Sequence, residues 1–258
     1  MSRLQGKIAL ITGAASGLGL RMAQRFAEQG AQVLLTDIDA EGAAKAAREI
    51  GGKAAAFRHD VTREDQWIAA VEECRRLFGG LHILVNNAGI GTPGTVEDTS
   101  LEDWRRVHAI DLDGVFLGCK HAIPLIRETT RREGSRGSIL NISSIAGVIA
   151  SGRMAAYNSA KAGVRHLTKS VALHCASSRD SITCNSIHPT FMDTPILDNF
   201  QSAGVGREEV KAKLGRQVPL GVIGEPDDVA WGAVYLCSDE ARFVTGAELF
   251  IDGGISAM

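Results

Sequence analysis

Long apolar runs, an excess of charge of one sign and paired cysteines are all missing from this 258-residue sequence. No stretch approaches the roughly 20 apolar residues of a membrane span, and the run Ile8–Ile11 is too short for the apolar core of a signal peptide. With 28 Lys and Arg against 30 Asp and Glu, the net charge of −2 gives no electrostatic reason to expect a nucleic-acid partner. We therefore predict a soluble protein with no membrane and no nucleic acid among its partners.

The five cysteines are scattered and odd in number, and no two of them form a CxxC pair. This distribution indicates reduced thiols in a cytosol-like compartment and favours neither a disulfide framework nor a zinc site. The sequence also has no HExxH pattern and no nucleophile elbow, so we interpret His188 as a structural or pocket-lining histidine. We expect a cytoplasmic protein without a bound metal.

Short apolar segments of β type alternate with longer helical patterns along the chain. The segments are continuous apolar runs, typical of strands covered on both faces. This alternation predicts an α/β fold, a doubly wound parallel seven-stranded sheet with helices on both faces, in a single domain over residues 1–258. The irregular region 189–224 holds three of the six prolines, and we interpret it as a mobile insert that acts as a substrate lid. The expected strands are Lys7–Thr12, Gln32–Asp37, Lys53–Arg58, Ile83–Asn86, Ser138–Ile142, Thr183–Ile187 and Glu248–Ile251.

The first expected strand runs into a glycine-rich turn, Thr12-Gly13-Ala14-Ala15-Ser16-Gly17-Leu18-Gly19, which opens an amphipathic helix. Glycines at such a turn let the backbone approach a pyrophosphate, and the free N–H groups of the helix end stabilise it. The turn therefore predicts a dinucleotide site. Its expected contacts are Gly13, Ser16, Gly17, Leu18 and Gly19.

The second expected strand ends in Asp37, an acid placed to accept hydrogen bonds from an adenosine ribose. Its charge would repel the 2′-phosphate of NADP, and neither Ser16 nor Ile38 offers a basic group to hold that phosphate. These residues predict NAD as the cofactor. Alternatively, or in addition, Asp37 caps a helix that starts at Ile38.

Tyr157 and Lys161 stand four residues apart, and Ser144 lies thirteen positions before Tyr157. Residues four apart share one face of a helix, so the ammonium group of Lys161 can lie beside the phenol. A nearby positive charge favours the ionised form of a phenol, which makes a competent general acid/base. The three residues predict proton transfer, with Ser144 fixing the substrate oxygen.

The glycine turn with the spacing TGxxxGxG, the run Asn86-Asn87-Ala88-Gly89 and the trio of Ser144, Tyr157 and Lys161 resemble the compact NAD-dependent branch of the short-chain dehydrogenase/reductase family. The resemblance spans essentially the whole chain. It implies a Rossmann fold, hydride transfer at a nicotinamide and a homotetramer, with a dimer as the alternative. It also implies that Asp60 and Val61 flank the adenine, that Asn87, Ala88 and Gly89 lie beneath the cofactor, and that Pro189, Thr190, Met192 and Thr194 bind its nicotinamide end.

Two positions depart from the pattern of that family. Thr190 follows the proline where the family usually has glycine, so the turn beside the nicotinamide is expected to differ in shape. Asp111 stands where the family has an active-site asparagine that props open a helix near the catalytic lysine. An ionised Asp111 near Lys161 would partly offset the charge that activates Tyr157.

The resemblance and the residues together predict an oxidoreductase that interconverts a secondary alcohol and a ketone. Apolar residues of the insert, Phe191, Ile196 and Leu197, suggest a bulky apolar substrate such as a hydroxysteroid or a cyclic or aromatic alcohol, unless they only pack the lid onto the body. The alternatives are a 3-oxoacyl thioester reductase and, in another class, a non-catalytic NAD-binding or NAD-sensing protein. Enoyl reductases of the family have a Tyr-to-Lys spacing longer than four.

Overall fold

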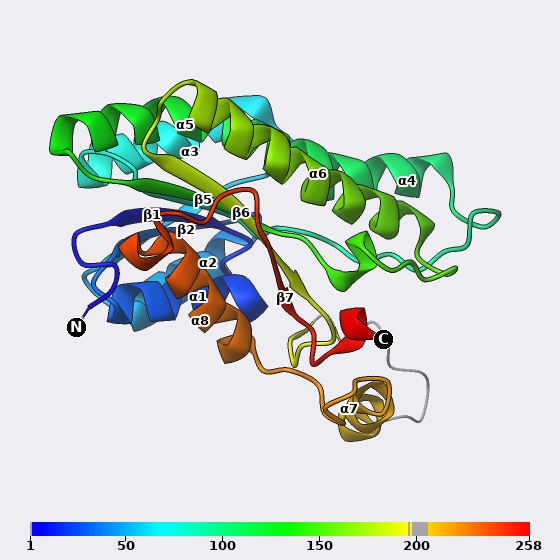
Figure 1. The fold of residues 1–258 in the computed structure, drawn as a ribbon. Helices are drawn as coiled ribbons and strands as arrows, with labels where there is room; N and C mark the ends of the chain where they lie inside the picture. Colours follow the sequence, from blue (N-terminus) through cyan, green and yellow to red (C-terminus); the bar gives the residue numbers. More distant parts are fainter. Residues whose placement is uncertain (1, 196, 198–205) are drawn as a thin grey trace.

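The computed structural model describes residues 2–195, 197 and 206–258. A parallel sheet of seven strands in the order β3-β2-β1-β4-β5-β6-β7 runs through the molecule (Figure 1). This confirms the predicted α/β fold with a doubly wound sheet. The strands are β1 (Ile8–Thr12), β2 (Gln32–Asp37), β3 (Ala54–Arg58), β4 (Ile83–Asn86), β5 (Gly137–Ile142), β6 (Ile182–Pro189) and β7 (Glu248–Ile251).

The helices lie on both faces of the sheet. Helices α1, α2 and α8 cover one face, and α3, α5 and α6 cover the other, with α4 extending beside α6 (Figure 1). Helix α7 stands apart, beyond the carboxyl end of β7. The helices are α1 (Gly17–Glu28), α2 (Ala40–Ile50), α3 (Glu64–Phe78), α4 (Leu101–His108), α5 (Gly114–Glu133), α6 (Ala155–Ser177), α7 (Arg207–Gly215) and α8 (Pro226–Cys237); short helical turns are η1 (Ala109–Asp113), η2 (Ile145–Gly147), η4 (Asp239–Ala241) and η5 (Ile255–Ala257).

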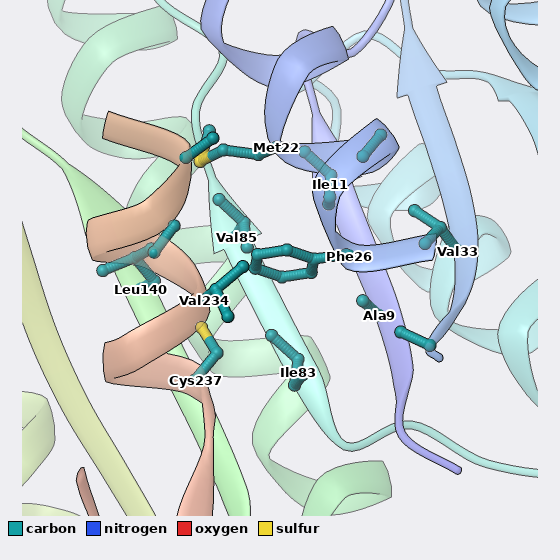
Figure 2. Close-up of a cluster of buried hydrophobic side chains, with 14 of the residues drawn as sticks. Ala9, Ile11, Met22, Phe26, Val33, Ile83, Val85, Leu140, Val234 and Cys237 are labelled. Atoms are coloured by element: carbon teal, nitrogen blue, oxygen red, sulfur yellow. The ribbon is translucent and has the colours of Figure 1, made fainter. Parts of the chain in front are cut away.

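Two apolar layers explain why the strands are continuous apolar runs. Along β1, Ala9 and Ile11 face the layer of α1, α2 and α8, whereas Ile8 and Leu10 face the layer of α3, α5 and α6. Figure 2 shows the first layer, where Phe26 of α1 lies among side chains of the sheet and of α8. Packing on both faces holds the sheet in place, and the predicted site residues follow the carboxyl ends of its strands.

Strand β6 runs two residues beyond its expected end, because His188 and Pro189 still pair with Phe250 and Ile251 of β7. The strand order reverses between β1 and β4, and open α/β sheets bind their ligands at the carboxyl edge of such a switch point. The predicted cofactor residues follow these strands. Among the described residues, no helix has the length and apolar character needed to cross a membrane.

Candidate active site

The turn between β1 and α1 forms a backbone cradle. Gly13 and Gly17 have φ angles of +63° and +56°, which side-chain-bearing residues rarely adopt. At Gly19 a Cβ atom would collide with the carbonyl oxygen of Gly13. Ser16 precedes α1 and its side chain caps no helix N–H group, while the Leu18 side chain packs against the core. The first N–H groups of α1 are therefore left for an anion such as a pyrophosphate.

The loop after β4 is bound to this cradle. The Asn87 side chain donates to the carbonyl oxygens of Thr12 (2.8 Å) and Gly13 (3.1 Å), and Thr12 Oγ1 accepts from the backbone N–H groups of Asn87 and Ala88 (both 3.0 Å). A Cβ atom on Gly13 would lie 2.9 Å from Ala88 Cα. The structure thus places Asn87 and Ala88 against the glycine turn.

Asp37 lies at the carboxyl end of β2, partly exposed. Its Oδ2 accepts from the Ala15 backbone N–H (3.0 Å) and its Oδ1 accepts from the Asp39 N–H (3.0 Å). The alternative that Asp37 caps the next helix is wrong: α2 begins at Ala40, and Asp39 is its cap, with its side chain accepting from the Gly42 N–H (3.0 Å). Asp37 is thus aimed at the turn and not at the helix.

Asp60 and Val61 follow β3 at the same edge of the sheet. The His59 N–H donates to the carbonyl oxygen of Asp37 (2.7 Å), which joins the two strand ends. Asp60 Oδ1 accepts from Thr62 Oγ1 (2.7 Å), and the Trp67 indole N–H donates to the Val61 carbonyl (2.9 Å). Ile38, the other residue predicted at this end, is 62% exposed and carries no charge.

The segment after β6 returns to the cradle. Thr194 lies 3.6 Å from the position that a Cβ atom on Gly17 would take. The Met192 side chain is buried against Gly224. Thr190 follows Pro189 at the end of β6, and its Oγ1 is buried without a hydrogen-bond partner within the described part of the chain. An unpaired buried hydroxyl and the glycine cradle fit a nicotinamide dinucleotide between them.

The trio lies on α6 and the turn η2. The Lys161 ammonium nitrogen is 5.6 Å from the centre of the Tyr157 ring, so both residues share one face of α6 as predicted. Ser144 precedes η2, and its Oγ accepts from the Ala146 N–H (3.1 Å). η2 packs on α6 so closely that a Cβ atom on Gly147 would lie 2.7 Å from the Lys161 carbonyl oxygen.

Asp111 lies in η1, a π-helical turn between α4 and α5. Its Oδ1 accepts from the Ile90 N–H (2.9 Å), and its Oδ2 lies 3.1 Å from the ammonium nitrogen of Lys161. That ammonium group also donates to the Ile142 carbonyl (3.1 Å). A wide helical turn of this kind is common at functional sites. The structure thus brings Asp111 to Lys161.

Both members of this pair are shielded from solvent, with side-chain exposures of 4% for Lys161 and 0% for Asp111. Burial alone would lower the pKa of Lys161, but the charges of Asp111 and Tyr157 outweigh it, so the pKa lies above its usual value. Burial raises the pKa of Asp111, and the Lys161 charge opposes that rise. The negative charges of Asp111 and Tyr157, together with the Ile142 carbonyl oxygen, keep Lys161 in its ammonium form, so Asp111 is one of several groups that do so.

The backbone and hydroxyl partners of the trio were not predicted from the sequence. Ser143 Oγ donates to the Lys161 carbonyl (2.9 Å), while the Ile90 N–H and the Ile142 carbonyl hold Asp111 and Lys161. A backbone group leaves no residue-type signal, so only the strand order, which puts the ends of β4 and β5 together, could have indicated them.

His188 is fully buried behind Ser144. Its Nδ1 lies 3.2 Å from the Ser144 carbonyl oxygen, its Nε2 lies 2.8 Å from Ser186 Oγ, and its ring stacks at 5.0 Å on Phe250. Burial lowers the pKa of His188. These contacts fit the structural interpretation, and the described residues contain no group of three or more side chains able to hold a metal ion.

Two of the apolar residues predicted to contact the substrate, Phe191 and Leu197, pack beside α7. Leu197 is buried in a small cluster with Val210, Leu214 and Ile223, against which Phe191 packs. The placement of Leu197 corresponds to the packing alternative and not to an open ligand surface. Ile196 lies outside the described residues.

A family model described as Enoyl-(Acyl carrier protein) reductase matches residues 13–256. The NADP-dependent (R)-specific alcohol dehydrogenase of Lentilactobacillus kefiri is 40% identical over 257 residues, which cover 99% of this chain and 98% of that protein. The 3-alpha-(or 20-beta)-hydroxysteroid dehydrogenase of Mycobacterium tuberculosis H37Rv is 42% identical over 256 residues, covering 99% and 91%. The structure of 3-ketoacyl-(acyl-carrier-protein) reductase from Brucella melitensis complexed with NADH is 38% identical, with a TM-score of 0.90 and coverage of 98% and 99%.

Proposed function

Since the chain belongs to the short-chain dehydrogenase/reductase family, we propose that it is an NAD-dependent oxidoreductase interconverting a secondary alcohol and a ketone. The observation that carries this proposal is the shared face of α6. It holds Tyr157 and Lys161 together, next to the turn that carries Ser144 and at the edge of the sheet where the glycine cradle lies.

In the oxidation direction Tyr157 removes the hydroxyl proton of the alcohol. Ser144 donates a hydrogen bond to the substrate oxygen and holds it near the phenol. The positive charge of Lys161 favours the phenolate that accepts the proton. The glycine cradle and residues 189–194 would hold the nicotinamide cofactor, which would accept the hydride that leaves the carbinol carbon. In reduction the same residues act in reverse, and Tyr157 returns the proton to the ketone oxygen.

NAD as the cofactor is supported by Asp37 of this chain. The Lentilactobacillus relative is NADP-dependent, so membership of the family leaves both cofactors open. Asp37 presents a carboxylate at the ribose end, fixed by two backbone N–H groups, and the neighbouring Ile38 carries no charge. A carboxylate there accepts hydrogen bonds from a ribose and repels a 2′-phosphate.

A bulky apolar alcohol is the substrate class we favour. Val148 and Ile149, four and five residues after Ser144, are 36% and 47% exposed and form an apolar surface near this serine. A relative is named for its action on hydroxysteroids. The alternative is a 3-oxoacyl thioester, as the name of the Brucella reductase suggests. The four-residue spacing of Tyr157 and Lys161 favours either of these over enoyl reduction, despite the description of the family model.

We further infer the setting in which the enzyme works. The five cysteines are all free and buried, which supports a reducing, cytoplasmic location. A homotetramer is proposed on the family resemblance, with a dimer as the alternative. The chain is proposed to act as one catalytic domain in which the segment 189–224, including α7, covers the substrate.

Formation of NADH tests this function, with cyclohexanol, a hydroxysteroid and a β-hydroxyacyl thioester as competing substrates. We expect turnover of an apolar alcohol and a loss of about 10²- to 10⁴-fold in Tyr157→Phe, the usual contribution of a general acid/base. Tyr235→Phe is the matched control, because Tyr235 lies on α8, across the sheet from α6. NAD binding without turnover of any alcohol would instead identify a non-catalytic sensor, and unchanged activity of Tyr157→Phe would refute the assigned proton transfer.

A further inference from the structure

The pair of Asp111 and Lys161 is a buried ion pair next to Tyr157, the proposed proton acceptor. Oδ2 of Asp111 lies 3.1 Å from the ammonium nitrogen, and that nitrogen lies 5.6 Å from the centre of the Tyr157 ring. Among the described residues, Oδ2 accepts no well-aligned hydrogen bond, so its interaction with Lys161 is chiefly electrostatic. The other oxygen, Oδ1, is held by the Ile90 N–H.

The local backbone is shaped around this pair. A Cβ atom on Gly89 would lie 2.9 Å from Asp111 Oδ2 and 3.1 Å from the Lys161 ammonium nitrogen, so glycine leaves the space that the two groups occupy. The π-helical turn η1 presents Asp111 to Gly89 and Ile90, in the loop that follows β4. The titratable groups that face the pair are Tyr157 from α6 and, more weakly, His108 from the end of α4.

We propose that Asp111 is a positioning residue that acts as the counter-ion of Lys161 and thereby moves the working range of Tyr157 to higher pH. The reasoning is one of charge: a lone ammonium group would favour the phenolate fully, whereas a paired one shares its field with a carboxylate. The functional meaning of this shift rests on the proposed dehydrogenase function. The shift itself is a property of the protein and can be measured without turnover.

The decisive measurement is a spectroscopic titration of Tyr157 in the cofactor-free protein. The chain has two tyrosines, so in a Tyr235→Phe background the phenolate absorbance reports Tyr157 alone. In that background we expect Asp111→Asn to lower the midpoint of the phenolate titration by about one pH unit, the scale expected for removing one nearby charge from a partly desolvated site. Asp113→Asn is the control, because it removes the same charge from an exposed position two residues away.

A midpoint that Asp111→Asn leaves in place or raises overturns the proposal. Asn retains an oxygen for the Ile90 N–H, so the loop stays anchored in this variant. If Asp111→Asn is poorly folded, Asp111→Ser removes the same charge with a smaller side chain and is read in the same way. If the role of Asp111 is merely structural, Asp111→Asn should lower the melting temperature of the protein but leave the midpoint of the Tyr157 titration at its original pH.

The full enzyme gives a second readout. The acidic limb of the pH profile for alcohol oxidation should move down by the same amount in Asp111→Asn and stay in place in Asp113→Asn. If no alcohol is turned over, the proposed function fails while the phenolate titration still decides the role of Asp111. If turnover is found but the midpoints of parent and variant coincide, the dehydrogenase function stands and the counter-ion role is rejected.

Discussion

Two carboxylates at the two ends of the site are held in opposite ways. Asp37, at the end of β2, is partly exposed and is bound by two backbone N–H groups. Asp111, in the π-helical turn η1, is fully buried and faces the ammonium group of Lys161. Water can solvate the first carboxylate if its partners are removed, but it cannot reach the second.

This difference separates recognition from stability. Replacing Asp37 changes what the cofactor end accepts and leaves the apolar layers untouched. Replacing Asp111 leaves the buried ammonium group of Lys161 without its counter-ion, which should lower the free energy of unfolding. The two ends of one site should therefore respond very differently to the same substitution.

The largest effect is expected for Asp111→Ala. Removing one partner of a buried ion pair typically costs about 3–5 kcal/mol, and the Ile90 N–H loses its acceptor as well. Asp37→Ala should cost no more than about 1 kcal/mol, since its site is open to water. The free energy of unfolding from urea titrations compares the two variants at neutral pH.

A double variant sharpens this comparison. If the cost in Asp111→Ala comes from the unpaired Lys161, adding Lys161→Met should recover much of it, because the buried charge is then gone. Equal stabilities of Asp111→Ala and Asp37→Ala, or no recovery in the double variant, would show that the ion pair does not stabilise the fold.

The same two acids show how far sequence could predict the site. Asp37 ends β2, which pairs with β1, the strand that runs into the glycine turn. The alternation of strands and helices was therefore enough to predict its place at the cofactor edge of the sheet. Its helix-capping alternative failed because the chain runs two residues further before α2 begins. The position of Asp111 near Lys161 followed only from the resemblance to a family.

The contacts that define Asp111 could not be predicted from residue types. They depend on a π-helical turn, on the Ile90 backbone N–H and on the absence of a side chain at Gly89. The apolar residues of the insert illustrate the same limit, because an apolar pattern does not distinguish a ligand surface from the packing of Leu197 under α7. Tertiary neighbours decide such cases.

The next largest effect on stability is expected at His59, which, like Asp111, is a titratable group shielded from water. His59 is 2% exposed, its Nδ1 lies 3.1 Å from Thr36 Oγ1, and burial lowers its pKa from 6.5 to about 4. Between pH 6.5 and about pH 4, His59 is therefore protonated in the unfolded chain but neutral in the folded protein. Stability is fully present above pH 6.5 and falls as the pH drops towards 4, by about 3 kcal/mol in all.

His59→Gln should flatten this acid dependence, whatever it does to stability at neutral pH. The quantity to compare is the difference in unfolding free energy between about pH 7 and about pH 4.5, measured with urea. His174→Gln serves as the control because His174 is exposed on the last turn of α6. An unchanged acid dependence in His59→Gln would place the proton uptake elsewhere in the chain.

The smallest effect on the fold, and the sharpest on specificity, is expected at Asp37. Asp37→Ser with Ile38→Arg removes the anion and adds a cation where the 2′-phosphate of NADP would lie, so kcat/KM for NADP relative to NAD should rise roughly 10- to 100-fold, equivalent to about 1.4–2.8 kcal/mol. Asp39→Ser is the matched control: it removes the same charge two residues on, and Ser still caps α2. Because Asp39 faces the helix and not the glycine turn, its replacement should leave the cofactor preference unchanged. A similar shift in both variants would mean that net charge at this edge, and not the aim of Asp37, selects the cofactor.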